Sequence, residues 1–505
     1  MNNTIKIVSI KLRYIIFIVI GILLSFSLPP YNLTIICFIV FPVLLFFLNW
    51  LIKKKYSNFF LFGLSFGFGY FLSSLYWIAY SLNFDKNLEI LKPFAIIFIP
   101  LFLSFFYGIV FFIYKKFVGK SIKSILYFSI ILTITEFVRG NIFTGFPWNL
   151  VIYSLSDHTK YLQLLSLFGT YGLNLLFVIF CCIPLLISFD NAKKNLIIIT
   201  SFIFFLVTTY FYGDYSLEKK LSKLDIKFVV LQPNENIKNI YNKPRIHIKN
   251  LINLSNPTKY SENTVFVWPE GSIYFEDIKL GLDNMSQVFD KKFKPGQKII
   301  FGATNLKNNK VYNSIFFINS DATLISKYDK IKLVPFGEFI PFESLVKKLG
   351  FKKITLGYDS FSKGKKRQTI NYNNIKMLPI ICYEIIYSGN LNMESKDFDL
   401  IINLSEDGWF NKSIGTYQHF YHSKFRAIEE GKQVIRATNQ GITASILPNG
   451  IVVNSRLFNQ KGNIVSEGFT LKKKTLFSQY GNIILCLLII MLLVFQNIFE
   501  RIKRE

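Results

Sequence analysis

The stretch MLPIICYE, residues 377–384, decides the fold assigned to the polar half of this chain. Its first five residues are apolar, as expected of a buried strand, and the strand runs directly into Cys382. In α/β folds the residues that carry chemistry gather at the carboxyl ends of strands. Cys382 is also the only cysteine outside the apolar runs, so this lone thiol has no obvious disulfide partner and requires an explanation.

Residues 220–470 carry further short runs rich in β-branched and aromatic residues, punctuated by Gly, Asn and Pro. The runs predict strands at 227–231, 264–268, 298–301, 314–318, 377–381, 399–403, 434–437 and 443–447, and a helix at 418–430. The strand at 264–268 runs into Pro269 and Glu270, so Glu270 and Cys382 are both expected at strand ends. A third candidate, Lys330, lies within the stretch 328–338.

The rest of the chain is dominated by uncharged apolar runs, most of them near the length of about 20 residues that a spanning helix needs. These runs occupy 14–30, 31–52, 57–84, 93–114, 161–189, 195–213 and 475–499. A weaker segment, 124–138, contains Glu136, which we expect to pair with Arg139 at the outer helix end. Basic connections at 115–123 and 193–194 both belong in the cytoplasm, and they share that side only if 124–138 also crosses. Eight spans follow, with both termini cytoplasmic.

This topology predicts seven helices within 1–213, an α/β domain at 214–474 on the outer face, and an eighth helix with a short basic cytoplasmic tail in 475–505. The net charge of +27 is interpreted as a membrane protein facing anionic lipid. No arginine-rich arm, RNP-type motif or zinc spacing accompanies the charge, so nucleic acid is not expected as a partner. The four histidines form no cluster with the cysteines in the sequence, which argues against a structural zinc site.

Acyl transfer needs a nucleophile, a base and a group that stabilises the oxyanion. Cys382 is the candidate nucleophile, because a modest lowering of a thiol pKa gives thiolate near neutral pH. Glu270 is the candidate base, since burial after an apolar strand raises a carboxyl pKa. Lys330 is the candidate for holding the developing negative charge. Taken singly, Cys382 is more simply a buried core residue, Glu270 a turn residue and Lys330 a surface charge. Only their combination points to catalysis.

The order and spacing of Glu270, Lys330 and Cys382 resemble the Glu–Lys–Cys set of the carbon–nitrogen hydrolase (nitrilase) superfamily. Further stretches are similar to the apolipoprotein N-acyltransferase family: LVPFGE (333–338), ICYE (381–384), DGWF (407–410), RATNQG (436–441), EFVRG (136–140) and TGFPW (144–148). The likeness therefore covers nearly the whole chain. It implies a nitrilase-like αββα sandwich joined to the membrane helices.

The resemblance implies a two-step acyl exchange without metal or soluble cofactor. Cys382 would take an acyl chain from a membrane phospholipid as a thioester, and the α-amine of a diacylglyceryl-cysteine at a lipoprotein N-terminus would then receive it. By the same likeness, Glu270 is base and acid, and Lys330 stabilises the oxyanion. The residues expected to orient the site or the substrate are Glu338, Tyr383, Glu384, Trp409 and Tyr241.

Four positions depart from the family pattern. Gly271 and Ser272 replace the usual small pair after the Glu, Glu406 stands where Asn is usual, and Tyr241 occupies roughly the place of a site-lining Trp. The implied enzyme is a bacterial inner-membrane protein, taken here as a monomer. The polar loops at 339–365 and 389–396 are hypothesised to open for the lipid chains.

Three alternatives stay open at this point. A membrane-anchored amidase of the nitrilase type would release its product to water instead of to an amine. A Cys-His hydrolase would use His419 or His422 as its base. A scaffold or transporter with an inactive nitrilase fold would need neither, although transport pathways usually place more charge within the spans than this chain does.

Overall fold

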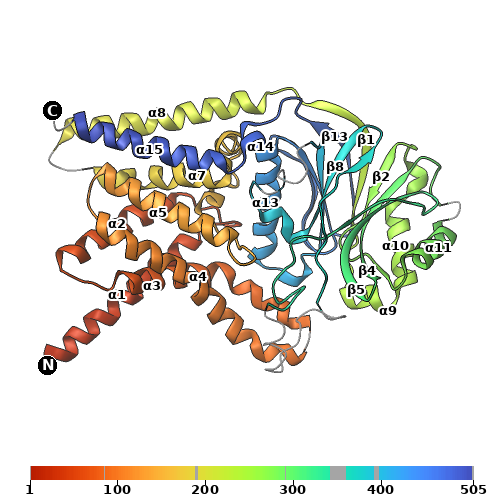
Figure 1. Cartoon of the computed structure of the whole chain (residues 1–505), viewed down its shortest axis with the longest axis horizontal. Helices are drawn as coiled ribbons and strands as arrows, with labels where there is room; N and C mark the ends of the chain where they lie inside the picture. Colours follow the sequence, from red (N-terminus) through yellow and green to blue (C-terminus); the bar gives the residue numbers. More distant parts are fainter. Residues whose placement is uncertain are drawn as a thin grey trace. The chain divides into compact units, whose positions relative to one another are not determined.

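The structure is a computed structural model that describes residues 2–84, 86–187, 191–289, 292–341, 360–389, 391 and 397–502. Most of the two loops hypothesised to open, namely residues 342–359, 390 and 392–396, lies outside the described residues. The chain divides into two compact units. The helical unit comprises Met1–Ala79, Ile90–Glu218 and Gln479–Glu505, and the sheet unit comprises Tyr80–Glu89 and Lys219–Ser478. Each is described by itself (Figure 1).

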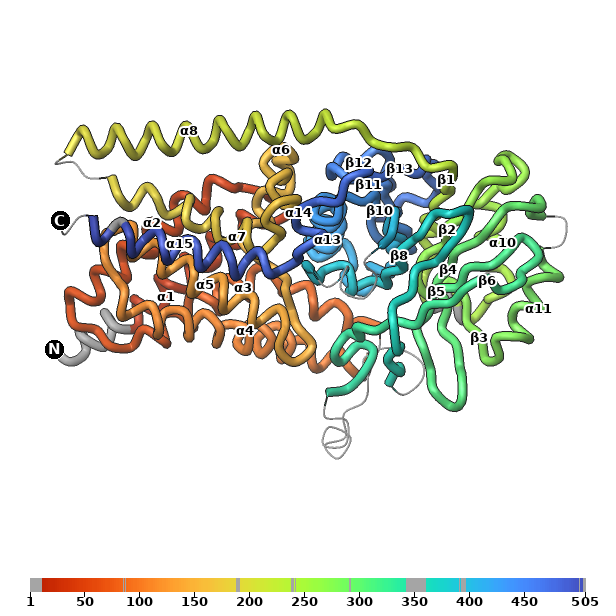
Figure 2. Tube along the Cα trace, turned by 45° about the horizontal axis from the view of Figure 1, so that its top comes forward, coloured from red at the N-terminus to blue at the C-terminus, as the bar shows by residue number. Residues whose placement is uncertain are grey.

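The helical unit is built from long apolar helices joined by short 3-10 turns. The α-helices are α1 (Asn2–Ser25), α2 (Ile35–Lys53), α3 (Phe59–Leu75), α4 (Lys92–Tyr114), α5 (Ile122–Asn141), α6 (Thr159–Leu162), α7 (Leu165–Cys182), α8 (Ala192–Leu217) and α15 (Ile483–Ile502). The 3-10 helices are η1 (Tyr76–Phe84), η2 (Lys86–Leu91), η3 (Lys115–Phe117), η4 (Val151–Leu155) and η5 (Ile183–Leu186). In Figure 2 the last helix, α15, lies along α7, so it packs with helices that precede the sheet unit in the sequence.

Six helices of the described residues are long and apolar enough to cross a membrane: Ile35–Lys53, Phe59–Phe84, Leu88–Phe117, Leu165–Leu186, Ala192–Leu217 and Ile483–Ile502. They coincide with six of the eight expected spans. The other two expected positions are occupied by α1 and by α5. The segment around 124–138, which looked short for a span, belongs to a helix of 20 residues.

Close helix packing in this unit depends on glycines. A Cβ on Gly21 of α1 would lie 2.1 Å from the Phe66 carbonyl oxygen, and one on Gly69 of α3 would lie 2.1 Å from the Ile18 carbonyl oxygen. Helices without a hydrophobic driving force between them gain stability from such close backbone approach. The pattern suits helices that pack within lipid.

The expected pairing of Glu136 with Arg139 is confirmed, and both side chains are buried. Tyr107 of α4 donates a hydrogen bond to Glu136 Oε1 at 2.8 Å, and Arg139 Nη2 donates to the Trp148 carbonyl oxygen at 2.9 Å. A buried ion pair is tolerated when its remaining donors and acceptors are satisfied in this way. The pair therefore ties α4, α5 and the loop at 142–148 together.

The sheet unit contains two sheets. One has the order β13-β1-β2-β4-β5-β6, with β3 paired to β4, and the other has the order β12-β11-β10-β9-β8-β7. The strands of the first are β1 (Ser222–Gln232), β2 (Thr264–Val267), β3 (Ile273–Phe275), β4 (Lys298–Lys307), β5 (Lys310–Asn319), β6 (Leu324–Asp329) and β13 (Gly462–Thr470). Those of the second are β7 (Ile370–Tyr372), β8 (Ile375–Ile381), β9 (Leu400–Ser405), β10 (Gln433–Thr438), β11 (Thr443–Ile446) and β12 (Val452–Arg456).

Helices cover the outer faces of these sheets (Figure 1). Apolar residues of α10 (Pro244–Ser255) and α11 (Ile278–Phe289) pack on β1, β2, β4 and β5, with Phe266 and Trp268 at the centre of that core. On the second sheet, α13 (Ile414–Glu430) packs on β10 and β11. The shorter helices are α9 (Ile237–Asn242), η6 (Pro257–Lys259), η7 (Cys382–Ile386), η8 (Gly408–Phe410) and α14 (Leu476–Tyr480). The unit is an α/β sandwich of the nitrilase-like type.

The eight predicted strands are all present, and the structure adds β3, β6, β7, β12 and β13. The predicted helix at 418–430 begins one turn earlier, at Ile414, because the Ser413 side chain accepts a hydrogen bond from the Gly415 amide and caps it. In each sheet the central strands are parallel: β1, β2 and β4 in the first, and β8, β9 and β10 in the second. Their carboxyl ends carry the candidate site.

Candidate active site

Cys382 lies where β8 ends and η7 begins. Its backbone is left-handed, with φ of +48°, a conformation that costs a non-glycine residue roughly 1 to 2 kcal/mol. Burial raises the pKa of the thiol well above its usual value, the Glu270 carboxylate raises it further, and the Lys330 ammonium acts in the opposite direction. The lowered thiol pKa expected from the sequence is therefore wrong for the resting site. The site holds a protonated thiol that needs a base.

Glu270 follows β2, where Gly302 of the neighbouring strand leaves room for its backbone. A Cβ on Gly302 would lie 2.5 Å from the Glu270 Cα. One carboxylate oxygen of Glu270 accepts from Asn313 Nδ2 at 2.7 Å, and the other accepts from the Glu406 backbone amide at 2.9 Å. Burial raises the pKa of Glu270, in the direction that the sequence predicted, and the charge of Lys330 opposes the rise. A base with a raised pKa is better able to take a thiol proton.

Lys330 follows β6 and is only 1% exposed. Its Nζ donates to Glu338 Oε1 at 2.9 Å and lies 3.7 Å from Glu270 Oε1. Burial alone lowers a lysine pKa, but the Glu338 and Glu270 carboxylates outweigh it and hold the pKa of Lys330 above its usual value. The ammonium is thus permanently charged and interacts electrostatically with Cys382, as an oxyanion-stabilising group requires.

Glu338 and Asn313 complete this charged cluster. Asn313 of β5 donates from the same Nδ2 to Glu338 Oε1 at 2.8 Å and to Glu270, so it bridges the two carboxylates. Glu338 Oε2 accepts from the Val334 amide at 2.9 Å. Glu338 therefore contacts Lys330 directly, while its expected role in orienting the site stays a prediction. Asn313 was missed by the sequence analysis because nothing around it distinguishes it from an ordinary strand residue.

Glu384 links the two sides of the site. Its Oε1 accepts from the amides of Ile331 and Lys332, the two residues after Lys330. It also accepts from Tyr328 Oη at 2.7 Å and from Arg367 Nη2 at 2.9 Å. Its Oε2 accepts from the Ile381 amide, next to the nucleophile, at 2.9 Å. Burial alone raises the pKa of Glu384, but Arg367 and the hydrogen bonds hold it below its usual value. Arg367 is a further residue that the sequence analysis missed.

The remaining candidates are placed less directly. Tyr383 is buried next to Cys382, with its ring 5.5 Å from that of Tyr387. Trp409 contacts the ring of Phe84 at a centroid distance of 4.3 Å, and Phe84 belongs to the short segment Tyr80–Glu89 that is compact with the sheet unit. Tyr241 lies in α9, but its side chain is outside the described residues.

Glu406 is buried beside the base. Its side chain accepts from the Gly408 amide at 2.8 Å and from Asn439 Nδ2 at 2.7 Å. Burial, with a smaller contribution from the Glu270 charge, raises the pKa of Glu406 to about 8. Glu406, which stands where the family usually has Asn, is therefore mostly neutral at pH 7 and adds little charge next to Glu270.

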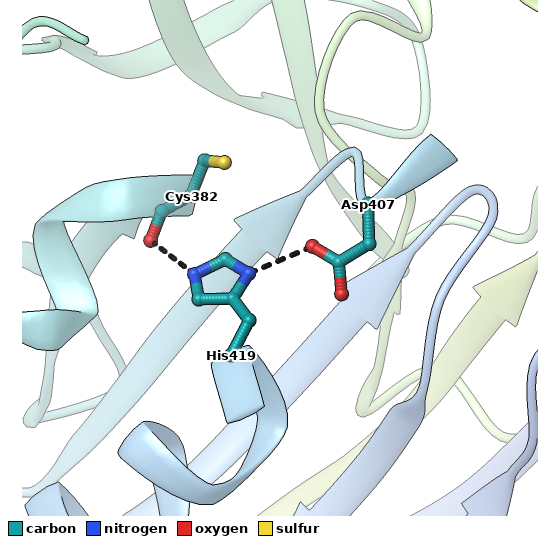
Figure 3. Close-up of side chains that lie close together, drawn as sticks. All are labelled: Cys382, Asp407 and His419. Atoms are coloured by element: carbon teal, nitrogen blue, oxygen red, sulfur yellow. Dashed lines mark hydrogen bonds and ion pairs between the residues drawn. The ribbon is translucent and has the colours of Figure 1, made fainter. Parts of the chain in front are cut away.

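Cys382, Asp407 and His419 lie together, with one thiol, carboxylate and ring-nitrogen atom of each within 4.8 Å of one another (Figure 3). This corrects the expectation that no histidine clusters with a cysteine, because the fold joins residues 37 positions apart in sequence. The set has the composition of a metal site. However, His419 Nδ1 already faces Asp407 Oδ1 at 2.8 Å and Nε2 faces the Cys382 carbonyl oxygen at 3.3 Å. The Arg436 guanidinium also donates a hydrogen bond to Asp407 Oδ2. These side chains therefore bond to one another as a hydrogen-bond network.

The same contacts bear on the Cys-His alternative. The His419 ring bonds to the backbone carbonyl of Cys382 and not to its sulfur. Burial alone raises the pKa of Asp407, but Arg436 and His419 hold it well below its usual range, so its anion stays in place beneath the ring. His422 is buried one turn further along α13, where burial lowers its pKa well below the usual value. Among the neighbouring carboxylates, Glu270 acts most strongly on the Cys382 thiol.

A buried thiol, a carboxylate with raised proton affinity and a fixed ammonium form a site for cysteine-based acyl chemistry. A family model described as carbon–nitrogen hydrolase matches residues 265–476. An amidase from Nesterenkonia sp. of known structure is similar at 9% identity over 51% of this chain and 94% of its own, with a TM-score of 0.34. The family-model match, together with the site, places the sheet unit in the carbon–nitrogen hydrolase class of enzymes.

A second family model, described as the apolipoprotein N-acyltransferase N-terminal domain, matches residues 20–183 in the helical unit. Apolipoprotein N-acyltransferase of Rhodopseudomonas palustris is 30% identical over 87% of this chain and 86% of its own length. That of Bradyrhizobium diazoefficiens is 30% identical over 97% and 96%. The chain belongs to the apolipoprotein N-acyltransferase family, and it is a membrane-associated acyltransferase.

Proposed function

We propose that the protein transfers an acyl chain from a membrane phospholipid to the N-terminal α-amine of a diacylglyceryl-cysteine on an apolipoprotein, through a thioester on Cys382. The observation that carries this proposal is that the buried Cys382 and Lys330 lie within mutual electrostatic reach of Glu270, whose side chain is 11% exposed, at the ends of strands from two sheets. No soluble cofactor enters the proposed reaction.

In the first step Glu270 removes the Cys382 proton, and the sulfur attacks the ester carbonyl carbon of the phospholipid. The oxygen that becomes negative is stabilised by the Lys330 ammonium, which Glu338 keeps in place. When the carbon–oxygen bond breaks, Glu270 returns the proton to the departing alkoxide. The products are a lysophospholipid and the Cys382 thioester.

In the second step Glu270, again unprotonated, takes a proton from the α-amine of the acceptor. The amine nitrogen attacks the thioester carbonyl, the same ammonium stabilises the oxyanion, and the carbon–sulfur bond breaks. The proton on Glu270 returns to the departing Cys382 sulfur. An amide has formed and the resting site is restored.

We further propose that eight helices, α1, α2, α3, α4, α5, α7, α8 and α15, cross the inner membrane, with both termini in the cytoplasm. Residues 214–474 then lie on the outer face as the catalytic domain, followed by the last span in 475–505. The six apolar helices and the charge of the connections support this topology. Anchoring lets both lipid substrates keep their acyl chains in the bilayer. Moving these chains into water would cost about 0.8 kcal/mol per CH₂. The enzyme is taken to act as a monomer.

The test is intact mass spectrometry of protein incubated with phospholipid vesicles and then with a diacylglyceryl lipopeptide. An acyl adduct on Cys382 is expected, and it should discharge to the lipopeptide amine. Cys382→Ala should form no adduct, whereas Cys486→Ala, which removes an exposed thiol of α15, should form it normally. Discharge to water at the same rate with and without lipopeptide would favour the amidase alternative instead, and an adduct in Cys382→Ala would exclude the proposed nucleophile.

A further inference from the structure

A buried hydrogen-bond network supports the backbone of Cys382 from behind the site. Arg436 of β10 donates from Nη2 to Asp407 Oδ2 at 2.8 Å, and the Ser405 hydroxyl donates to Asp407 Oδ1 at 2.8 Å. Asp407 in turn faces His419 Nδ1, and His419 Nε2 faces the Cys382 carbonyl oxygen at 3.3 Å. The side chains of Arg436, Asp407 and His419 are fully buried. Thus β9, β10 and α13 converge on one carbonyl group.

That carbonyl belongs to the strained residue of the site. Cys382 has φ of +48° and is not glycine, so its turn persists only where surrounding contacts determine it. In Figure 3 the carbonyl oxygen of Cys382 points to the His419 ring while its sulfur points away. A bond that fixes the carbonyl therefore also fixes the direction of the Cα–Cβ bond that carries the sulfur.

The Cys382 carbonyl oxygen can only accept, so its contact with His419 Nε2 is a hydrogen bond when Nε2 carries a proton, as it does in two protonation states of the ring. Arg436 Nη2 lies 3.1 Å from His419 Nδ1, and when it donates there the ring proton is on Nε2. In the doubly protonated ring, Nδ1 donates to Asp407 and Nε2 again carries a proton. In both states Nε2 donates to the Cys382 carbonyl oxygen.

We propose that His419 is a positioning residue for acyl transfer: held by Asp407 and Arg436, its Nε2–H bond to the Cys382 carbonyl oxygen keeps the nucleophile turn in the conformation that presents Sγ to the ester. This rests on the proposed role of Cys382 as the nucleophile. His419 does not touch the substrate and does not accept the thiol proton.

Two amide substitutions separate this role from simple core filling. The amide nitrogen of Gln reaches roughly the position of Nε2, whereas that of Asn reaches only the position of Nδ1. His419→Asn should therefore slow acyl-enzyme formation from phosphatidylethanolamine vesicles by roughly 10- to 100-fold, with KM for the lipid unchanged. His419→Gln should restore most of that loss. His422→Asn makes the same change one turn along α13 and serves as the control for loss of a buried ring.

The pH profile distinguishes positioning from base catalysis. In both His419 variants the acid limb of the single-turnover rate should stay at its wild-type pH, because Glu270 still sets it, while the amplitude falls. Equal rates in the Asn and Gln variants, or a limb that moves with His419, would overturn the proposal. Adduct formation in Cys382→Ala would instead refute the nucleophile itself, so the two failures are distinguishable.

A measurement of melting temperature tests the link between His419 and the Cys382 turn without relying on activity. Glycine tolerates a left-handed backbone better than alanine, so Cys382→Gly should melt higher than Cys382→Ala when His419 is present. If His419 holds the turn, that difference should shrink at least twofold in the His419→Asn background and much less in the His419→Gln background. An identical difference in all three backgrounds would refute the proposal.

Discussion

Replacing Glu338 by Gln should move the pH dependence of acyl-enzyme formation to lower pH. Glu270 and Glu338 both accept from one nitrogen, Asn313 Nδ2, at 2.7 and 2.8 Å, and among the described residues only one ammonium, that of Lys330, is paired with them. The repulsion from Glu338 is one of the causes that raise the pKa of Glu270, after burial itself. Removing that charge must lower the pKa of Glu270, and the whole attraction of Lys330 then acts on it.

The size of the shift follows from the geometry. Because Glu270 Oε1 and Glu338 Oε1 accept from the same nitrogen at 2.7 and 2.8 Å, they cannot be further apart than the sum of these distances. Two like charges at about 5 Å repel by roughly 3 kcal/mol at an effective dielectric constant of about 20. Since one pKa unit corresponds to about 1.4 kcal/mol, the upper bound is near two units, and relaxation reduces it to about one to two. The rate requires unprotonated Glu270, so its acid limb should shift down by that amount. The plateau should fall by about three- to tenfold, because the weaker base takes the thiol proton less readily.

The assay is single-turnover acylation of Cys382 between pH 5 and 9, read by intact mass, with the rate of Cys382 alkylation by iodoacetamide as a lipid-free measure of the same limb. Glu467→Gln removes one carboxylate from an exposed pair with Lys223 and should leave the limb in place. A limb in Glu338→Gln that stays at the wild-type pH, or moves up, would refute the assignment of Glu270 as the base that Glu338 tunes.

Three further predictions concern single groups. Glu430 is buried, neither of its carboxylate oxygens has a hydrogen-bond partner among the described residues, and burial raises its pKa to about 8. The unfolded chain loses this proton near pH 4.5, so the unfolding free energy of the wild type should fall by up to roughly 5 kcal/mol between pH 4.5 and 8. The melting temperature of Glu430→Gln should therefore rise relative to that of the wild type over the same pH range. Glu384→Gln removes the charge that pairs with the buried Arg367 guanidinium and disturbs the bond from the Ile381 amide, so it should cost about 3 to 5 kcal/mol of unfolding free energy. The control Glu467→Gln should cost less than about 1 kcal/mol, and equal melting temperatures of the two variants would contradict this prediction. Gly302→Ala should lower the acylation rate at least about tenfold by displacing the Glu270 backbone, whereas Gly119→Ala, whose Cβ meets nothing nearer than 3.9 Å, should have no effect on that rate.

The sequence predicted strand positions well, and it placed Glu270 and Cys382 correctly at strand ends. The strands concerned, β2 and β8, turn out to belong to different sheets, and no pattern within either strand reveals which sheet it joins. Only the family resemblance implied two stacked sheets. The convergence of the two residues is thus a property of the sandwich, which long-range packing determines.

Buried polar residues were the hardest to find from sequence. Arg367, Arg436 and Asn313 look like ordinary surface or strand residues, because a single sequence gives the type of a residue but not its burial. The structure shows all three inside, each bonded to a carboxylate or to a partner of one. The prediction of a lowered pKa for Cys382 was wrong for the same reason. The sequence indicated nearby cations, but not how deeply the thiol is buried or how many carboxylates face it.

The raised pKa values of Cys382 and Glu270 are best understood together. The free energy of moving the proton from sulfur to carboxylate depends on the difference between the two pKa values, and burial raises both. Burial therefore keeps the reactive thiolate scarce in the empty site without making proton transfer proportionally harder. Once an ester carbonyl is present, the charge leaving the sulfur moves to an oxygen, where the fixed Lys330 ammonium can stabilise it. We infer that the nucleophile is activated by arrival of the acyl donor and is not stored as an anion, which would otherwise react with water-borne oxidants at the membrane surface.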